Sequence, residues 1–480
     1  MDSLLLLCAR RMVAHHPLPT LPAHLYPVLF QVAFLDGRSL VLRDLVATWP
    51  FPVLHFQRLL GHRELLQYHD YKLCVEAIIQ AVVAQLVKPG HHSSLRVLDI
   101  TGLPAVIPTW FSTEVLAKAC MEVSRYQQEF QRRRSKRHKG CTGAVTAPPQ
   151  TSGVDVHADL YVSISCYSIL RDALPTGIAH LLRLKCREFV SDELLASQIV
   201  TLLESLDPSC LRRVKLWLNK FRLTGLSVIL PHLSRFPELR SLSFQEGNVY
   251  NLDRMPESAD GIRCVARHLG MLPNLRELSL GYSRLSGNLR HILSDLQAPL
   301  ESLELDCCFL VPADIAFLSQ SFHTAALKKL NLSGHNISQG LLEPLQLLLE
   351  ETSASLLYLE LECCSMDNSH LHALLPTLLR CSRLRFLRLY DNPLCMAALK
   401  DLLQKTLELP DLKLVVYPQP RDCFRLEPSE FGRDFREVVD EELLAAVTAE
   451  ISQLLENSGR TDLVWTDNPY GHEGLDYFSL

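Results

Sequence analysis

The stretch LRELSL, residues 275–280, decides the fold because its spacing of leucines recurs along the chain. LESLEL follows at 300–305 and LKKLNL at 327–332, and LLYLEL and LRFLRL stand at 356–361 and 384–389. A motif that returns at this interval is typical of a protein built from stacked, similar units.

Weaker copies extend the array in both directions. LRRVKL begins at 211, LRSLSF at 239 and LKLVVY at 412, and a degenerate copy, HLLRLKC, lies at 180–186. From 211 onward the first leucines are 28, 36, 25, 27, 29, 28 and 28 residues apart. The longest interval contains the polar stretch QEGNVYNLDRMPESADG, which we interpret as an inserted loop, either a functional lip beside the binding face or a tolerated insertion.

This repeat predicts an α/β fold, a leucine-rich-repeat solenoid with the horseshoe shape of the ribonuclease-inhibitor type. Leucines two residues apart on a strand point to the same side, so they face the core while their neighbours face the concave surface. One unit cannot bury its own apolar face, but stacked units share a continuous core. We expect a protein partner to contact concave-face residues at Trp217, Lys220, Gln245, Tyr282, Asp306, Glu362 and Tyr390.

A ladder position follows the last leucine of each motif by three residues. It holds Asn219, Ser283, Cys308, His335, Cys364 and Asn392. A column of cysteine and histidine raises the idea of a metal site, but a fourth ligand is not evident. We interpret the column as structural, with side chains that bond to the loop backbone, and we expect no metal.

The chain outside the array divides by pattern. We expect amphipathic helices broken at TWPFP (48–52), an isolated capping strand at 95–103, and a helix at 112–131 that Ser112 caps. The basic run RRRSKRHK (132–139) is either a solvated helix end or a nuclear-import or anion-binding signal. The predicted regions are 1–90 (N-terminal helices), 91–131 (capping strand and helix), 132–153 (basic run and loop), 154–210 (degenerate repeats), 211–417 (repeats) and 418–480 (C-terminal cap and tail). In the last region we expect a capping helix at 437–459. The aromatic tail after it either packs on the last repeat or serves as a recognition peptide.

Composition narrows the class of protein. Hydrophobic residues make up 48% of the 480 residues and the net charge is −5, which favours a large core and gives no sign of a nucleic-acid partner. No stretch is apolar for long enough to span a membrane or to act as a secretion signal, so we expect a cytoplasmic protein that also reaches the nucleus if the basic run is an import signal.

The 15 cysteines form no CxxC pair, which indicates reduced thiols. Motifs of phosphate loops, metalloproteases and serine hydrolases are absent from the sequence, so we expect no enzyme and no cofactor.

The N-terminal segment SLLLLCARRM (3–12) poses a separate question. Leu4, Cys8 and Met12 are four residues apart and share one helix face. This is the pattern of an ordinary packing helix or of a docking helix. The spacing resembles the elongin-binding box of cullin-RING substrate receptors, although Met12 departs from that box, whose last position prefers Ala, Ile, Leu or Val.

A second motif follows, with Leu21, Pro22, Leu25 and Leu29. It resembles the cullin-2 box, and its Leu-Pro-x-x-Leu start also resembles an F-box. Pro22 suits the first turn of a helix, whereas Pro27 should kink or end that helix.

Four stretches together resemble the PRAME family: residues 21–54, LRVLDITG at 95–102, the repeats, and the ending DYFSL at 476–480. The resemblance implies a substrate receptor of a cullin-2 RING ubiquitin ligase, with elongin B/C, cullin-2 and an unidentified substrate protein as partners. The alternative is a scaffold or inhibitor of a signalling protein, as in the NF-κB pathway, that binds through the concave face without a ligase.

Overall fold

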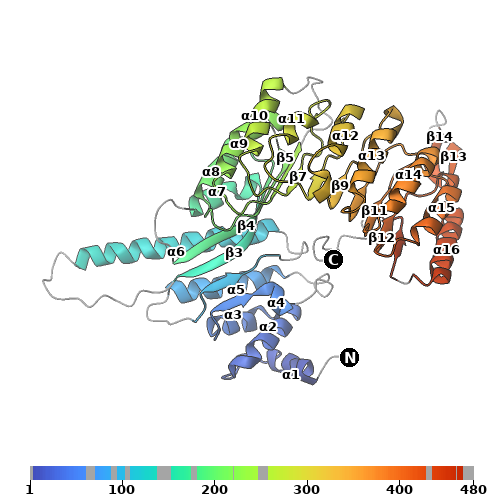
Figure 1. Ribbon diagram of the computed structural model, residues 1–480. Helices are drawn as coiled ribbons and strands as arrows, with labels where there is room; N and C mark the ends of the chain where they lie inside the picture. Colours follow the sequence, from blue (N-terminus) through green and yellow to red (C-terminus); the bar gives the residue numbers. More distant parts are fainter. Residues whose placement is uncertain are drawn as a thin grey trace. The chain divides into compact units, whose positions relative to one another are not determined.

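The computed structural model divides the chain into two compact units (Figure 1). The first holds residues 1–219 and 232–239, and the second holds residues 220–231 and 240–480. The structure describes residues 4–60, 71–87, 94–102, 109–137, 153–174, 181–219, 221–246, 258–428, 435–460 and 462–468.

The first unit begins with helices that pack around an aromatic core. Phe34 stacks on Tyr71 with ring centroids 4.9 Å apart, and Phe30 meets Trp49 and Phe56 edge to face. Such pairs add to the free energy gained by burying the rings. The helices of this unit are α1 (Leu4–Val13), η1 (Ala23–Leu25), α2 (Tyr26–Leu35), α3 (Ser39–Ala47), α4 (Phe56–Leu60), α5 (Lys72–Val87), α6 (Thr109–Arg137), α7 (Ile164–Ala173) and α8 (Ala196–Ser205).

Parallel strands complete the first unit. They pair in chain order and are β1 (Val53–His55), β2 (Val97–Asp99), β3 (Val154–Val162), β4 (Leu182–Asp192) and β5 (Arg213–Asn219). β2 confirms the strand predicted within 95–103, and β4 contains most of the degenerate motif at 180–186 but continues beyond it to Asp192. β1 was not predicted.

The second unit repeats a strand, a turn and a helix. Its strands pair in parallel with no register shift, and Figure 1 shows α12 to α15 on one side of them. We call the opposite side of these strands, and the matching side of β5, the concave face. The elements are β6 (Ser241–Glu246), α10 (Ala259–Leu269), β7 (Glu277–Ser279), α11 (Leu289–Leu293), β8 (Ser302–Glu304), α12 (Pro312–Ser319), β9 (Lys329–Asn331), α13 (Leu342–Thr352), β10 (Tyr358–Glu360), α14 (Asn368–Arg380), β11 (Phe386–Arg388), α15 (Met396–Thr406) and β12 (Leu414–Val416).

The leucine motif forms the core as predicted. All three motif positions are buried in every copy from 211 to 417. In LESLEL, for example, Leu300, Leu303 and Leu305 are each inaccessible to solvent. Burial of such a side chain contributes about 1.5–3 kcal/mol, so the array rests on many similar contributions.

A C-terminal cap ends the second unit. β13 (Phe424–Pro428) and β14 (Phe435–Val439) form an antiparallel pair, α16 (Glu441–Ser458) follows, and β15 (Val464–Thr466) then adds in parallel to β12. Arg460 lies between α16 and β15 and donates hydrogen bonds to the carbonyls of Leu407, Leu409 and Leu412 at 3.0, 2.9 and 2.7 Å. One guanidinium therefore ties the cap to the end of the last repeat.

Several local predictions were wrong. Pro27 does not end a helix, because α2 begins at Tyr26 and places Pro27 in its first turn, where the missing N–H costs nothing. Ser112 does not cap α6, which begins three residues earlier at Thr109. The C-terminal helix starts at Glu441 and not at 437, since residues up to Val439 belong to β14.

Some predictions lie outside the described residues. They include most of the inserted loop at 245–261, the end of the basic run beyond Arg137, and the last part of the tail. Within the part of the chain that the structure describes, no helix is both long and apolar enough to cross a membrane.

Candidate protein-binding surfaces

Helix α1 turns an apolar face outward. Leu4 is 77% exposed, Leu5 and Leu7 are about half exposed, and the thiol-bearing Cys8 is exposed as well. These four residues form what we call the α1 anchor face. Of the three predicted elongin-box residues, Leu4 and Cys8 lie on this face, and Met12 is half-buried.

The opposite side of α1 holds the helix in place. Ala9 and Val13 are buried there. Arg10 lies 3.7 Å from the Asp36 carboxylate at the end of α2, and His16 Nε2 lies 2.6 Å from the Asp44 carboxylate of α3. α1 is thus docked on the first unit by one face, while its leucine-rich face stays accessible.

The second N-terminal motif is only partly at the surface. Pro22 is exposed and precedes the short helix η1, and Leu21 and Leu25 are half-buried. Leu29 is 2% exposed and packs in the core of the unit. The motif therefore offers a partner the turn around Pro22 and η1, and not the whole Leu21–Leu29 segment.

The concave face of the second unit carries coupled charges. Lys329 on β9 lies 2.6 Å from Glu304 on β8 and 3.6 Å from Glu360 on β10. One strand further, Arg388 lies 2.9 Å from Glu362. These ion pairs bridge neighbouring repeats across the face where a partner would lie.

Asp306 stands beside this network. Burial, together with the negative charges of Glu304 and Glu360, raises the pKa of its carboxyl to about 6, against the opposing effects of a hydrogen bond from its own backbone amide and of Lys329. The side chain lies against Gly281, where an added Cβ would come within 2.6 Å of a carboxylate oxygen. The ionised form of Asp306 is thus disfavoured, and a cationic group from a partner would stabilise this ionised form.

Toward the C-terminal end, the concave face becomes apolar. Tyr358, Phe386, Leu414 and Val416, which we call the apolar cluster, come from β10, β11 and β12. Tyr390 packs against the cluster. All four members are buried, at 0–4% exposure, although they occupy the side of the strands opposite the helices.

The remaining predicted concave-face residues differ in setting. Trp217 on β5 is half-buried, lies edge to face with Tyr161 and has the Lys215 ammonium 5.7 Å from its ring centroid. Gln245 is half-buried, and Lys220 lies outside the described residues.

Tyr282 corrects the alternation argument. It follows Leu280 by two residues, and its φ of 62° places it in a left-handed turn beyond the end of β7.

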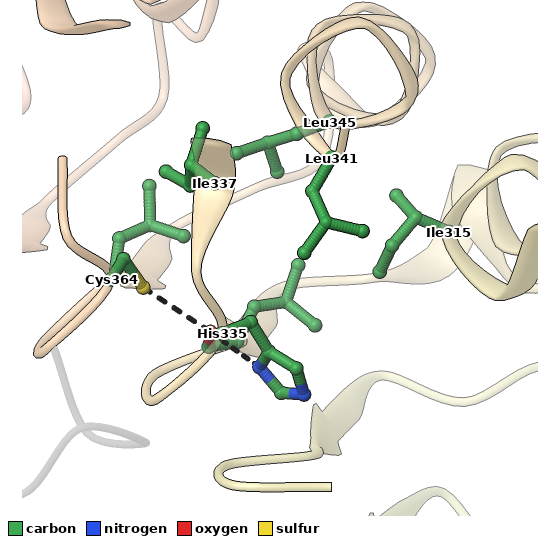
Figure 2. A pocket seen from close by; sticks show the side chains of 8 residues that line it. Ile315, His335, Ile337, Leu341, Leu345 and Cys364 are labelled. Carbon is green, nitrogen blue, oxygen red and sulfur yellow. Dashed lines mark hydrogen bonds between the residues drawn. The ribbon is translucent and has the colours of Figure 1, made fainter. Parts of the chain in front are cut away.

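The ladder column is structural in most repeats. Asn392 accepts from Cys364 N and Met366 N at 3.0 Å and donates to the Leu361 and Leu389 carbonyls at 2.7 and 2.8 Å. In Figure 2, His335 and Cys364 border a small apolar cavity, and both side chains bond the carbonyl of Leu332.

Neither the cavity nor the ladder offers a ligand site. The cavity, about 10 Å³, is too small for an organic ligand. Within the described ranges no group of three or more histidine, cysteine, aspartate or glutamate side chains is arranged to hold a metal ion.

Family models match both parts of the chain. The model described as the PRAME N-terminal domain matches residues 6–105, and that of the PRAME C-terminal domain matches residues 178–472. The chain belongs to the PRAME family. This confirms the resemblance drawn from the sequence.

Relatives of this PRAME-family chain are leucine-rich repeat proteins. It is 40% identical over 512 aligned residues to Leucine-rich repeat-containing protein 14 of Xenopus laevis, with both chains fully covered. The Bos taurus protein of the same name is 41% identical over 490 residues, covering 96% of each chain. Among solved structures, the yeast Rad7 and Elc1 complex is similar at a TM-score of 0.33 and 13% identity, covering 54% of this chain and 68% of that one, which is too distant to carry an argument.

Sequence reasoning about this PRAME-family chain missed the ion pairs and the apolar cluster. Lys329 and three members of the apolar cluster occupy one position of the motif, the residue before its second leucine, which reads Glu277, Ser302, Lys329, Tyr358, Phe386 and Leu414 from β7 to β12. Glu304, Glu360, Arg388 and Val416 occupy the residue after that leucine, which faces the same side. Comparing the copies at that position shows the change from polar to apolar. Only the register of the strands shows that these residues are neighbours.

Proposed function

We propose that this protein is a non-enzymatic substrate receptor of a cullin-2 RING ubiquitin ligase. In this proposal the α1 anchor face binds elongin C, the turn at Pro22 and η1 contributes to cullin-2 binding, and the concave face holds the substrate protein. The observation that carries the proposal is the outward apolar face of α1.

Two physical arguments support this role for α1. Leu4 is 77% exposed, and the other face of α1 is anchored to the first unit. The apolar surface of Leu4 is therefore removed from water only when a partner covers it, which is favourable. A helix docks in a groove through side chains one turn apart, and Leu4 and Cys8 have that spacing. Leu5 and Leu7 would widen the contact on either side.

The test is capture of elongin B/C and cullin-2 by the full-length protein. Changing Leu4→Ala together with Cys8→Ala removes both central anchors, and we expect a loss of about 2–4 kcal/mol, or roughly 30- to 1,000-fold in affinity. Leu40→Ala is the matched control, because Leu40 is an exposed leucine on α3 of the same unit. It should leave elongin binding unchanged.

Normal capture of elongin by the double variant would overturn the proposal. Capture of a signalling protein through the concave face, with neither elongin nor cullin present, would favour the scaffold or inhibitor role instead.

A further inference from the structure

Ion pairs join neighbouring strands of the first unit on the side of its sheet that carries Trp217. In each pair, an acid on one strand is matched by a cation on the next strand along the chain. The pairs are Asp155 with Arg183 at 2.5 Å, Asp159 with Arg187 at 3.3 Å, and Glu188 with Lys215 at 2.6 Å. Each of these acids therefore has its counter-charge within the sheet.

Asp192, the last residue of β4, departs from this pattern. Its neighbour in the register of β5 is Trp217, whereas the two preceding rows of β5 hold Arg213 and Lys215. In the described part of the chain, Asp192 Oδ2 accepts a hydrogen bond from the neutral Tyr161 hydroxyl, and Oδ1 has no hydrogen-bond partner. Asp192 thus keeps a negative charge that the sheet does not compensate.

Tyr161 holds the Asp192 carboxylate beside the indole of Trp217. Burial, followed by the hydrogen bond to Asp192, raises the pKa of the Tyr161 hydroxyl, so this group stays protonated and donates at neutral pH. The Tyr161 ring also meets Trp217 edge to face, with ring centroids 6.4 Å apart. All three side chains are half-buried near the carboxyl ends of β3, β4 and β5, and we call them the Trp217 site.

Lys215 lies close to the same indole but does not neutralise Asp192. Its ammonium is 5.7 Å from the ring centroid of Trp217 and forms its ion pair with Glu188. The charges of Lys215 and Glu188 cancel, so the charge that remains beside Trp217 is that of Asp192. A cation over the face of an indole is itself a favourable arrangement.

We propose that the Trp217 site binds an arginine side chain of the protein partner. A guanidinium group stacks on aromatic faces, and its N–H donors lie in its own plane, so they stay available to acceptors at the edge of the ring. The uncompensated charge of Asp192 attracts such a cation. The inference rests on the proposed use of the concave face for substrate binding and adds the chemistry of one contact.

Fluorine NMR of the full chain tests the site. The chain has four tryptophans, so labelling with 5-fluorotryptophan gives few signals, and Trp217→Phe identifies the signal of Trp217. The probes are the acetylated and amidated peptides Gly-Arg-Gly, Gly-Lys-Gly and Gly-citrulline-Gly, in which citrulline is the uncharged analogue of arginine. We expect the arginine peptide to shift the Trp217 signal saturably at millimolar concentration. The lysine peptide should bind more weakly, and the citrulline peptide should cause no saturable shift.

Two variants test the role of the charge. Asp192→Asn keeps an acceptor for the Tyr161 hydroxyl but removes the negative charge, and it should weaken binding of the arginine peptide about fivefold. Asp155→Asn is the matched control, because it changes the net charge equally but lies about 20 Å along β3 from Tyr161. It should leave binding of the peptide unchanged.

Three results would each contradict the proposal. They are a Trp217 signal that does not respond to the arginine peptide, a lysine or citrulline peptide that binds as tightly as the arginine peptide, and equal weakening by the two variants. The titration contains neither elongin nor cullin. Its outcome is therefore separate from that of the capture experiment on the α1 anchor face.

Discussion

At the scale of single residues, the ladder shows how unequal similar positions are. Asn392 is 4% exposed, and its side chain forms five backbone hydrogen bonds that join two repeats. Ser283 occupies the same position four repeats earlier, is fully buried, and its hydroxyl has no partner among the described residues. A buried polar group stabilises the fold only when it is hydrogen-bonded.

We therefore expect opposite outcomes at the two positions. Asn392→Ala leaves two N–H groups and two carbonyls unpaired and should lower the free energy of unfolding by about 3–4 kcal/mol. Ser283→Ala removes a hydroxyl without a hydrogen bond among the described residues and should change the free energy of unfolding by less than about 0.5 kcal/mol. Urea-induced unfolding measures the free energy of unfolding of each variant. Amide hydrogen exchange in β7 and β11 then shows where the change lies. A large loss for Ser283→Ala would show that its hydroxyl has a partner.

Residue types predicted the ladder but not the turns next to it. Tyr282, Cys307, Cys363 and Asp391 all have φ between 53° and 62°, and Gly334 has the same role with φ 77°. The left-handed region favours glycine. Four of these five positions hold another residue, so the sequence did not reveal that the same turn recurs there. The turn is imposed by the stacking of repeats, which local preference cannot show.

At the scale of elements, helix α1 was predictable and its setting was not. The four-residue spacing of Leu4 and Cys8 predicted a shared face, and the structure exposes it. Nothing in the spacing indicated that Ala9 and Val13 would hold the other face against α2. The error at Pro27 has the same origin, since a proline is tolerated or disruptive according to where the helix begins.

Arg460 gives a prediction for the C-terminal cap. Arg460→Gln removes guanidinium bonds to three carbonyls and should destabilise the cap by about 2–3 kcal/mol. Hydrogen exchange in β12 and β15 should become about 30- to 150-fold faster. Arg421→Gln, at an exposed arginine of the same cap, is the control. Equal hydrogen-exchange rates in the two variants would show that Arg460 does not tie the cap to the last repeat.

At the scale of the whole molecule, the repeats were the most predictable part. The same three apolar positions recur in every copy, and all of them are buried. This repetition makes the motif recognisable in the sequence, and the motif predicts the α/β repeat fold. The binding surfaces were less predictable, because they depend on which side chains meet across strands. The pair between Lys329 and Glu360 joins residues 31 positions apart and appears only once the register is known.

Stacking predicts that damage to the second unit stays local. Leu303→Ala in β8 creates a cavity and should cost about 2–5 kcal/mol. Because repeats contact mainly their neighbours, exchange should rise in β7 and β9 far more than in β12. Leu347→Ala, at a half-exposed leucine on α13, should change stability by less than about 0.5 kcal/mol. A uniform rise across all strands would show that the array unfolds as one cooperative block.

The short strand β15 has a consequence for self-association. A parallel array without a terminator presents a row of unpaired amides and carbonyls on which another copy can polymerise. Among the described residues, the last strand of the sheet is β15, which follows α16 in the chain and spans only Val464–Thr466. It covers β12 and offers an edge too short to pair stably with another copy. We therefore expect this edge to disfavour strand-to-strand association between copies of the protein.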